Sequence, residues 1–449
     1  MNLILGAGLS GLSCSYHLGH DNCVILEAAN HAYGHIHSRS ENGFTWDEGP
    51  HVSFTKHDYV KELFVESVGG EYEEQEVTLT NYWNGHWIEH PAQLHLHALP
   101  EDIRKKCVDS FLEIPEESRT PLNYGEWLDL SFGKFFANEF SRRYTRKYWT
   151  VEAEEMGTDW VGGRIHRPEK EALLAGSQTS TGIRGHYIQK IRYPSRGGYK
   201  QFARKLADGA RILFGAQVVS VDAKSREVQT ADGKKYQYNR LVNTLPLPVF
   251  LGMLSGIDKH ILEIARELKC SRLLLVNIAA KQPTPRPNPW FYVYDEDKLS
   301  TRINFTERLS PHNAPTGSTG IQSEVYYRKG ITDEMSPEAI AAKVKTELKE
   351  MGLLQPDVEC QIHTWPVNWA NVIFTKQTSS LLEQVWTELE KFGLIRESQD
   401  TSPITDWSAS SENKIGSLAM AGRFGQWKYF WTDDCVLRGK SIAYESRLV

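Results

Sequence analysis

The feature that most constrains the fold is a cluster of three glycines near the start of the chain. Residues 1–18 read MNLILGAGLSGLSCSYHL, so Gly6, Gly8 and Gly11 have the spacing G-x-G-x-x-G. Small apolar residues precede the glycines and a helical spacing of leucines follows them, which predicts a strand, a tight turn and a helix. A turn of this kind lets the backbone and the helix N-terminus approach a pyrophosphate closely.

The residues after this turn complete the pattern of a dinucleotide site. Residues 23–26 (CVIL) predict a second buried strand, which ends at Glu27. An acidic side chain at this point can accept hydrogen bonds from both hydroxyls of an adenosine ribose. A glycine-rich turn and a surface glutamate would explain each feature alone, but not the spacing of all of them together. We therefore predict that the chain binds a dinucleotide.

Length and composition restrict the class of protein. With 449 residues the chain is too long for one simple core, so two joined domains are expected. The net charge of −6 gives no electrostatic case for a nucleic-acid partner. No apolar run is long enough to cross a bilayer, and the strand expected at the N-terminus leaves no room for a signal peptide. A small-molecule substrate is the expected partner, and the oligomeric state is left undetermined.

The cysteines and histidines do not form a metal-site pattern. Six scattered cysteines with no paired spacing predict reduced thiols in a cytoplasmic protein. The pairs His35 and His37, and His95 and His97, lack neighbouring Cys or carboxylate residues at the spacing of a zinc site. No metal site is expected.

The nucleotide-binding segments are separated along the chain. The α/β pattern occupies residues 1–75, returns at 195–250, and closes the chain at 401–449 with a strand, a glycine turn and a helix. Residues 76–194, which include a helical stretch, and 251–400 lie between them and predict a substrate-binding domain. We therefore expect an α/β fold, in which an interrupted Rossmann-like domain carries an inserted α+β substrate domain. A plain NAD dehydrogenase normally completes its sheet in one stretch, so the interruption favours FAD.

Several motifs resemble a known family. GAGLSGLSCSYHL, ILEAANHAYGHIHS, FTWDEGPHVSFT, YPSRGGYKQFARKLA, LVNTLPLPV and GRFGQWKY are together similar to the flavin-containing amine oxidase and protoporphyrinogen oxidase superfamily, which consists of GR2-type flavoproteins. Within it the chain most resembles the UDP-galactopyranose mutases, especially those of the eukaryotic type. The narrower resemblance is carried by GFTWDEGPHVSF, WVGGRIHRP, STRINFTERLSPHN and GRFGQWKYFWTDD. It covers the chain end to end and is loosest in the middle.

The resemblance implies a set of cofactor-binding and catalytic residues. It places the adenosine and pyrophosphate of FAD on the glycine turn and the acidic residue, the adenine on the backbone of a middle strand, and the flavin ring beside a histidine. The implied cofactor-binding residues are Gly6, Gly8, Leu9, Ser10, Gly11, Glu27, Ala28, Gly34, His35, Gly49, Pro50, His51, Val218, Gly422, Arg423 and Asp433. The implied catalytic residues, of which the two arginines would bind a substrate diphosphate and the tyrosine a substrate phosphate, are His51, Arg164, Arg302 and Tyr429.

Two positions depart from the family pattern. His35 stands where members usually have the second of two glycines, so its side chain must point away from the flavin or replace a contact with it. The mutases also keep a tyrosine in a segment aligned near WANVIFTKQ, where this chain has Asn371 or Phe374. The second departure predicts that one phosphate contact is missing and leaves a different substrate open.

Purely structural roles compete with these assignments. Arg164 could form an ion pair with Glu154 or Glu155. Arg302 has Glu307 and Asp297 as rival partners, and His51 could be an ordinary core histidine. The aromatic residues of the second half could form a substrate cage, but core packing is expected for most of Trp365, Trp369, Trp427 and Trp431.

The resemblance implies one reaction and leaves two alternatives. The implied reaction interconverts the pyranose and furanose forms of a nucleotide-diphosphate sugar, as in polysaccharide biosynthesis, by covalent catalysis with reduced FAD. NADPH or NADH would be the source of reducing equivalents. The first alternative is an oxidoreductase of the amine oxidase or protoporphyrinogen oxidase type, in which oxidised FAD accepts a hydride. The second is a non-catalytic FAD-binding relative. GRFGQWKY favours the mutase, whereas the missing tyrosine favours a divergent member.

Overall fold

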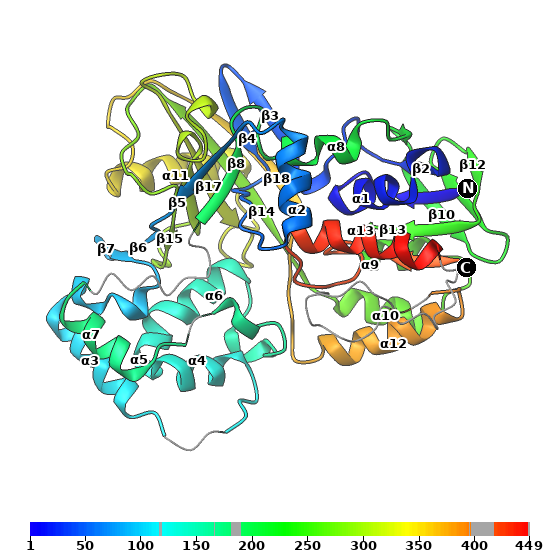
Figure 1. Cartoon of the computed structure of the whole chain (residues 1–449). Coiled ribbons are helices and arrows are strands. Elements are labelled where there is room, and N and C mark those ends of the chain that lie inside the picture. Colours follow the sequence, from blue (N-terminus) through cyan, green and yellow to red (C-terminus); the bar gives the residue numbers. More distant parts are fainter. Residues whose placement is uncertain (116–118, 166, 181–189, 395, 397–416, 448–449) are drawn as a thin grey trace.

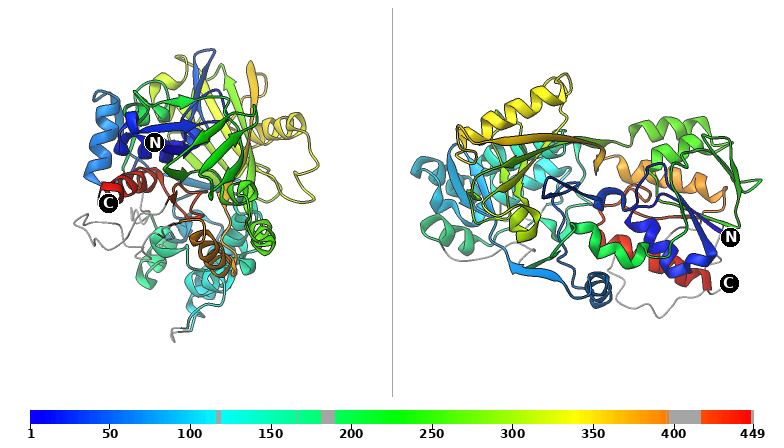
Figure 2. Two further views of the ribbon diagram at one scale, coloured as in Figure 1. Left: turned by 90° about the vertical axis from the view of Figure 1, so that its right-hand side faces the viewer. Right: turned by 90° about the horizontal axis from the view of Figure 1, so that it is seen from above.

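The computed structural model describes residues 1–115, 119–165, 167–180, 190–394, 396 and 417–447. Two large β-sheets form its framework, and a helical segment lies below one of them in the view of Figure 1. The first strand and the last helix lie at the same end of the molecule (Figures 1 and 2). This mixed arrangement confirms the predicted α/β fold class.

The first large sheet is parallel and contains the predicted N-terminal strand. Its strand order is β19-β13-β1-β2-β9, and every neighbouring pair is parallel. Parallel sheets are covered on both faces, which is why these strands are continuous apolar runs instead of alternating ones. Its strands come from separated parts of the chain: β1 (Asn2–Leu5), β2 (Cys23–Leu26), β9 (Ile212–Leu213), β13 (Arg240–Asn243) and β19 (Leu418–Met420).

Helices cover both faces of this parallel sheet. On one face the first and last helices of the chain pack side by side, and Leu12 and Val436 share a core with Ile4 (Figure 1). On the other face Leu3 and Leu5 lie in a core with three helices from the second half of the chain. These five helices are α1 (Leu9–Leu18), α13 (Thr432–Arg447), α9 (Leu247–Met253), α10 (Lys259–Glu267) and α12 (Thr378–Glu390).

Smaller elements adjoin the parallel sheet. A turn at Asp232 and Gly233 connects two strands of a three-stranded antiparallel sheet, which consists of β10 (Val218–Asp222), β11 (Glu227–Thr230) and β12 (Lys235–Gln237). A 3-10 helix, Tyr199–Ala203, continues directly into α8 (Arg204–Ala207). The remaining elements are α2 (Asp58–Ser67), β3 (Ser38–Glu41), β4 (Phe44–Asp47), β5 (Tyr72–Glu76) and β8 (Lys190–Pro194).

The second large sheet has seven strands in the order β18-β14-β17-β16-β15-β6-β7. All pairs are antiparallel except β15 with β6, which is parallel. The helix α11 (Pro337–Glu350) packs on one face, where Val344 shares a core with Val276 and Ile278. The strands are β6 (Thr80–Trp83), β7 (His86–Glu89), β14 (Cys270–Ala280), β15 (Trp290–Val293), β16 (Arg302–Phe305), β17 (Thr319–Tyr326) and β18 (Cys360–Val372).

The helical segment between β7 and β8 has an aromatic core of its own. Phe136 and Phe140 stack with ring centroids 4.6 Å apart, and Trp149 contacts Trp160. A π-helical turn, Ala137–Ser141, joins two of its helices. Its α-helices are α3 (Glu101–Leu112), α4 (Tyr124–Phe132), α5 (Lys134–Phe136), α6 (Arg142–Tyr148) and α7 (Lys170–Gln178).

The domain limits remain a prediction. The strands of the parallel sheet lie in residues 1–75, 195–250 and 401–449, and the boundary predicted at residue 401 lies outside the described residues. Helices α10 and α12, which belong to the range 251–400, pack on the parallel sheet. Within the described residues, no helix combines the length and apolar character needed to cross a membrane.

Candidate active site

A cavity of about 450 Å³ is lined by residues of the seven-stranded, mostly antiparallel sheet, of the turns that follow β1, β13 and β19 of the parallel sheet, and of the last helix. Fourteen of the residues predicted to bind cofactor or substrate line it: Gly6, Gly8, Leu9, Ser10, Gly34, His35, Gly49, Pro50, His51, Arg302, Gly422, Arg423, Tyr429 and Asp433. The other predicted residues do not line it, namely Gly11, Glu27, Ala28, Arg164 and Val218. Two of the four tryptophans considered above, Trp369 and Trp431, also line the cavity, whereas Trp365 and Trp427 are buried.

We use "glycine region" for the part of the cavity lined by Gly6, Gly8, Ser10, Gly34 and Gly422. Here the backbone segments lie so close that side chains would collide. A Cβ on Gly34, whose φ is +52°, would lie 2.9 Å from Cα of Gly8. A Cβ on Gly422 would lie 2.9 Å from Oγ of Ser10. The glycine region therefore presents main-chain surface at the start of α1.

The N-terminus of α1 is suited to bind an anion. Its N-cap residue, Gly8, has no side chain to accept a hydrogen bond from the first N–H groups of the helix. These N–H groups carry the positive end of the helix dipole. Gly11 lies one turn further on, where a Cβ would be 2.0 Å from the carbonyl oxygen of Gly6, so only glycine lets the helix pack this closely on the turn.

The carboxylate of Glu27 is held by the backbone on both sides. Its Oε2 accepts a hydrogen bond from the N–H of Ala7 at 2.7 Å, and its Oε1 accepts one from the N–H of Ala29 at 2.8 Å. Each oxygen retains a further lone pair for a hydroxyl donor. Glu27 is thus oriented at the end of β2, although it does not line the described cavity.

His51 lines the cavity and is half-buried. Burial lowers the pKa of its imidazole to about 4. Its Nδ1 lies 2.9 Å from the carbonyl oxygen of Gly49. Because a carbonyl can only accept, Nδ1 carries the proton and Nε2 is left as an acceptor.

His35, which departs from the family pattern, is part of the cavity wall. Its Nδ1 pairs with the carboxylate of Glu48, a second cavity residue. Its ring lies 5.3 Å from that of Phe424, which also lines the cavity. In the described part of the chain, no group of three His, Cys, Asp or Glu side chains is arranged to hold a metal ion.

We use "arginine region" for the part of the cavity lined by Tyr148, Arg302, Tyr326, Asn371, Arg423 and Tyr429. Arg302 forms a two-point ion pair with Glu324, through Nε to Oε2 at 2.9 Å and Nη2 to Oε1 at 2.6 Å. Burial alone would lower the pKa of the guanidinium, but Glu324 raises it well above its ordinary value. The rival partners Glu307 and Asp297 are therefore wrong, because the carboxylate that pairs with Arg302 is directly opposite on β17.

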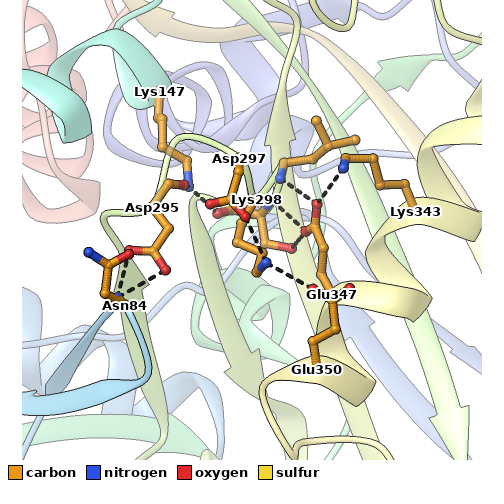
Figure 3. A network of polar contacts seen from close by, with 10 residues as sticks. Asn84, Lys147, Asp295, Asp297, Lys298, Lys343, Glu347 and Glu350 are labelled. Carbon is orange, nitrogen blue, oxygen red and sulfur yellow. Dashed lines mark hydrogen bonds and ion pairs between the residues drawn. The ribbon is translucent and has the colours of Figure 1, made fainter.

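A polar network fixes the loop that precedes Arg302 (Figure 3). Buried Lys147, on α6, donates from Nζ to the carbonyl oxygens of Val293, Asp295 and Ser300 at 2.7–3.0 Å. Glu347, on α11, accepts from the N–H groups of Leu299 and Ser300. The loop between β15 and β16 is thus held by hydrogen bonds to side chains of α6 and α11, two helices that lie far apart in the sequence.

Arg164 and Arg423 lie on the same aromatic ring. Their guanidinium carbons are 4.8 and 4.7 Å from the ring centroid of Tyr429. Among the described residues, neither guanidinium has a carboxylate within 4.0 Å, and the Nε of each is buried without a hydrogen-bond partner. The alternative that Arg164 pairs with Glu154 or Glu155 is wrong, because these carboxylates bind Arg142 and Lys269.

Arg164 instead bonds to the backbone. It donates to the carbonyl oxygens of Trp160 at 3.0 Å and Tyr429 at 3.1 Å. Arg164 has an electrostatic effect on Asp434, whose oxygen accepts from the N–H of Trp431 at 2.8 Å. Burial raises the pKa of Asp434 to about 6, and Arg164 opposes that rise. Arg164 therefore lies behind Tyr429, outside the cavity lining itself.

The sequence analysis missed three tyrosines of the cavity. Tyr148, Tyr292 and Tyr326 line the cavity from α6, β15 and β17. Nothing in their sequence spacing connects them. Of the two candidates for the missing family tyrosine, Asn371 lines the cavity and Phe374 does not. A bulge in β18, where residues 368–370 lie opposite Arg272 alone, precedes Asn371.

Comparison with known proteins identifies the family. The model of the flavin containing amine oxidoreductase family matches residues 9–380. The chain belongs to this family. Three solved structures share the fold. A reduced UDP-galactopyranose mutase is 23% identical, with a TM-score of 0.88 over 100% of this chain and 95% of that one. A proposed protoporphyrinogen oxidase from Exiguobacterium sp. 255-15 is 16% identical, with a TM-score of 0.72 over 100% and 98%.

The third structure is a putrescine oxidase with bound putrescine. It is 14% identical to this flavin amine oxidoreductase, with a TM-score of 0.61 over 99% of this chain and 98% of that one. At such identities the likeness shows the fold alone, so the three structures do not distinguish a mutase from an oxidase.

Family membership implies that this flavin amine oxidoreductase binds FAD, and the glycine region fits that cofactor. The uncapped start of α1 can bind the pyrophosphate. Gly34 and Gly8 lie close together without side chains, so main-chain atoms face the cavity there. Glu27 is oriented at the end of β2, the position that binds the ribose in such folds. Which individual residues contact the cofactor stays a prediction.

Proposed function

We propose that the chain is a mutase-like enzyme that interconverts the pyranose and furanose forms of a nucleotide-diphosphate sugar. The observation that carries this proposal is the pair of guanidinium groups on Tyr429. Arg164 and Arg423 are half-buried cations without carboxylate partners among the described residues, so their positive charge is available to stabilise an anion. A diphosphate supplies that anion, and arginine binds phosphate oxygens in a two-point geometry.

The same observation weighs against an amine substrate. An amine enters as an ammonium ion, which the positive charges of Arg164 and Arg423 would repel at close range. The alternative of an amine oxidase or protoporphyrinogen oxidase remains the second candidate because the fold is shared with such enzymes. The charge in the arginine region favours the nucleotide sugar.

The residues near His51 suit a neutral sugar. The ion pair of Arg302 with Glu324 has no net charge, and Glu324 also lies near Gly49, where a Cβ would be 3.2 Å from its Oε1. Carboxylate and guanidinium groups can bind several sugar hydroxyls as acceptor and donor. When bound in its reduced form, the flavin would supply the nucleophile for the anomeric carbon.

The protein's own contribution is then to bind and orient. Arg423 binds the diphosphate while it leaves and returns, Arg164 adds positive charge from behind Tyr429, and neutral His51 offers Nε2 as an acceptor. NADPH or NADH is the proposed source of reducing equivalents. We also propose a cytoplasmic location, because all six cysteines are free thiols. Polysaccharide biosynthesis is the corresponding pathway class.

An anaerobic experiment tests the proposal. The FAD-loaded protein is reduced with dithionite and given a panel of nucleotide-diphosphate sugars, and the sugars are separated by chromatography. We expect pyranose and furanose forms to interconvert only with reduced protein, without net consumption of reductant. Hydrogen peroxide formed in air from an amine, with no interconversion of any sugar, would establish the oxidase instead.

A further inference from the structure

The loop between β2 and β3 carries two histidines, His31 and His37, whose rings stack on each other. Four of the residues between them line the cavity: Tyr33, Gly34, His35 and Ile36. We propose that this stacked pair is an acid-sensitive switch, in which protonation of His37 opens the loop and lowers the affinity for FAD. The proposal requires that the chain binds FAD and holds whichever reaction the protein catalyses.

Loop 31–37 is attached to the glycine region by close backbone contacts. The N–H of Tyr33 donates to the carbonyl oxygen of Ala7 at 2.8 Å. A Cβ on Gly34 would lie 2.9 Å from Cα of Gly8. Tyr33 has a φ of +85°, which is unfavourable for a residue with a side chain and persists only where the surroundings enforce it. The loop therefore depends on the contacts at its ends, and its movement would open the glycine region.

The stack at the ends of the loop is suited to neutral imidazoles. The two ring centroids are 3.9 Å apart, with 19° between the planes. The ring of His37 also meets the ring of Trp365 edge to face, with centroids 6.2 Å apart. Nδ1 of His37 is buried and has no hydrogen-bond partner among the described residues. A neutral ring can leave this nitrogen unprotonated, whereas an imidazolium has two N–H groups that both require acceptors.

The charges around His37 also oppose its protonation. Arg39, on β3, lies with its guanidinium 3.9 Å from the ring centroid of Trp365. Lys200, on the 3-10 helix after β8, donates to the carbonyl oxygen of Ser38 at 2.8 Å. Burial is the main cause that lowers the pKa of His37 to about 4, and the positive charges of His31, Lys200 and Arg39 act in the same direction. Glu48 opposes this shift, but its carboxylate is paired with His35.

The direction of the pH effect follows from the two states of the loop. In an open loop the imidazole of His37 is in water, where its pKa has the ordinary value of 6.5. Between pH 6.5 and 4 the open form therefore binds more protons than the closed form, so acid favours opening. The closed form is fully favoured above pH 6.5. FAD binds to the closed loop, so its affinity should fall with the pH.

FAD binding at different pH values tests the proposal. FAD is titrated into the full-length protein at pH 7, 6 and 5, and its affinity is measured from the change in flavin fluorescence. We expect the wild-type affinity to fall about 20-fold from pH 7 to pH 5 and to return at pH 7. Far-UV circular dichroism at each pH shows that the chain stays folded. Equal affinity at pH 7 and pH 5 would overturn the proposal.

Replacing His37 separates its role from other effects of acid. His37→Phe keeps an aromatic ring for the stack and cannot take up a proton, so we expect its FAD affinity to change less than about threefold between pH 7 and 5. His37→Gln, also neutral, is measured with the same expectation if the first variant does not fold. His260→Gln is the control, because this exposed histidine on α10 should leave the full pH dependence. A wild-type loss of FAD in both His37 variants would contradict the switch.

His51 is the second histidine near the cofactor cavity with a pKa of about 4. It lies outside loop 31–37, so opening of the loop does not release it. We expect His51→Gln to lose FAD on acidification as the wild type does. If this variant is insensitive to pH while His37→Phe remains sensitive, the switch is at His51 and the proposal is overturned.

Failure of this inference and failure of the proposed function give different results. The sugar assay is carried out at pH 7, where loop 31–37 is closed. Interconversion of sugars at pH 7 with an FAD affinity that does not depend on pH would overturn the inference alone. Loss of FAD in acid by a protein that converts no sugar and oxidises an amine would overturn the proposed function alone.

Discussion

The glycine region and the arginine region of the cavity are built in different ways. In the glycine region, the groups that matter are main-chain atoms of Gly6, Gly8 and Gly34, held together by close backbone packing. In the arginine region, they are side chains that meet from distant elements, such as Tyr148, Asn371 and Arg423. We therefore expect the glycine region to bind the cofactor that family members share. The side chains of the arginine region can differ between members that act on different substrates.

Disturbing the packing of the glycine region should have the largest effect. In Gly11→Ala the new Cβ would lie 2.0 Å from the carbonyl oxygen of Gly6, so α1 must move away from the turn. We expect a colourless protein whose free energy of unfolding falls by about 3 kcal/mol or more. The measurements are flavin absorbance and denaturant unfolding.

Gly252→Ala is the matched control for this change. Gly252 is helical and nothing lies within 4 Å of its added Cβ, so the same substitution should leave stability and FAD content unchanged or slightly raised. Normal FAD content in Gly11→Ala would show that the glycine region does not depend on this close contact.

The arginine region should depend on distant supports. Lys147→Met removes the donor for three buried carbonyl oxygens of the loop before Arg302 (Figure 3). Leaving such groups without partners should lower the free energy of unfolding by about 3 kcal/mol and weaken sugar-nucleotide binding, with FAD content maintained. Lys343→Met is the control, because Lys343 is an exposed, 4.0 Å partner of Glu347 in the same network and should change stability by less than about 0.5 kcal/mol. Equal effects of the two variants would contradict this role of Lys147.

A smaller effect is expected at the cofactor ribose. In Glu27→Gln, one of the two backbone N–H groups that now meet a carboxylate oxygen would face an amide NH₂. The affinity for FAD should fall about 10- to 30-fold, corresponding to the loss of one charged hydrogen bond, and UDP affinity of the loaded protein should be unchanged. Glu359→Gln, on an exposed surface pair, is the control. Unchanged FAD affinity would remove Glu27 from the cofactor site.

The smallest expected effect is a pH dependence from His51. Its pKa of about 4 lies below the ordinary value of 6.5, so the unfolded chain takes up the proton first as the pH falls. The stability that neutral His51 contributes is complete above pH 6.5 and is lost between pH 6.5 and 4. Relative to His51→Gln, the wild type should lose about 1 kcal/mol between pH 6.5 and 5.5. Parallel stability curves for the two proteins would contradict the shift, and His260→Gln, an exposed histidine, serves as control.

The strand, turn and helix at the N-terminus could be predicted because neighbouring residues encode them. The burial of residues 3–5, the glycine spacing and the leucines of α1 all act within one short segment. The parallel strand β2 was likewise predicted from its apolar run. The ion-pair partner of Arg302 could not be predicted, because Glu324 becomes its neighbour only through the pairing of β16 with β17.

Sequence alone thus determined where the backbone approaches a dinucleotide, and through resemblance it indicated the family. Only the tertiary structure decided which arginine is paired with a carboxylate. The reason is physical: a turn depends on the φ and ψ of adjacent residues, whereas the charge of a site depends on which side chains the strand order and register bring within a few ångströms. Arg302 and Arg423 are the same residue type, but Arg302 pairs with the carboxylate of Glu324, whereas Arg423 donates to the neutral amide of Asn371.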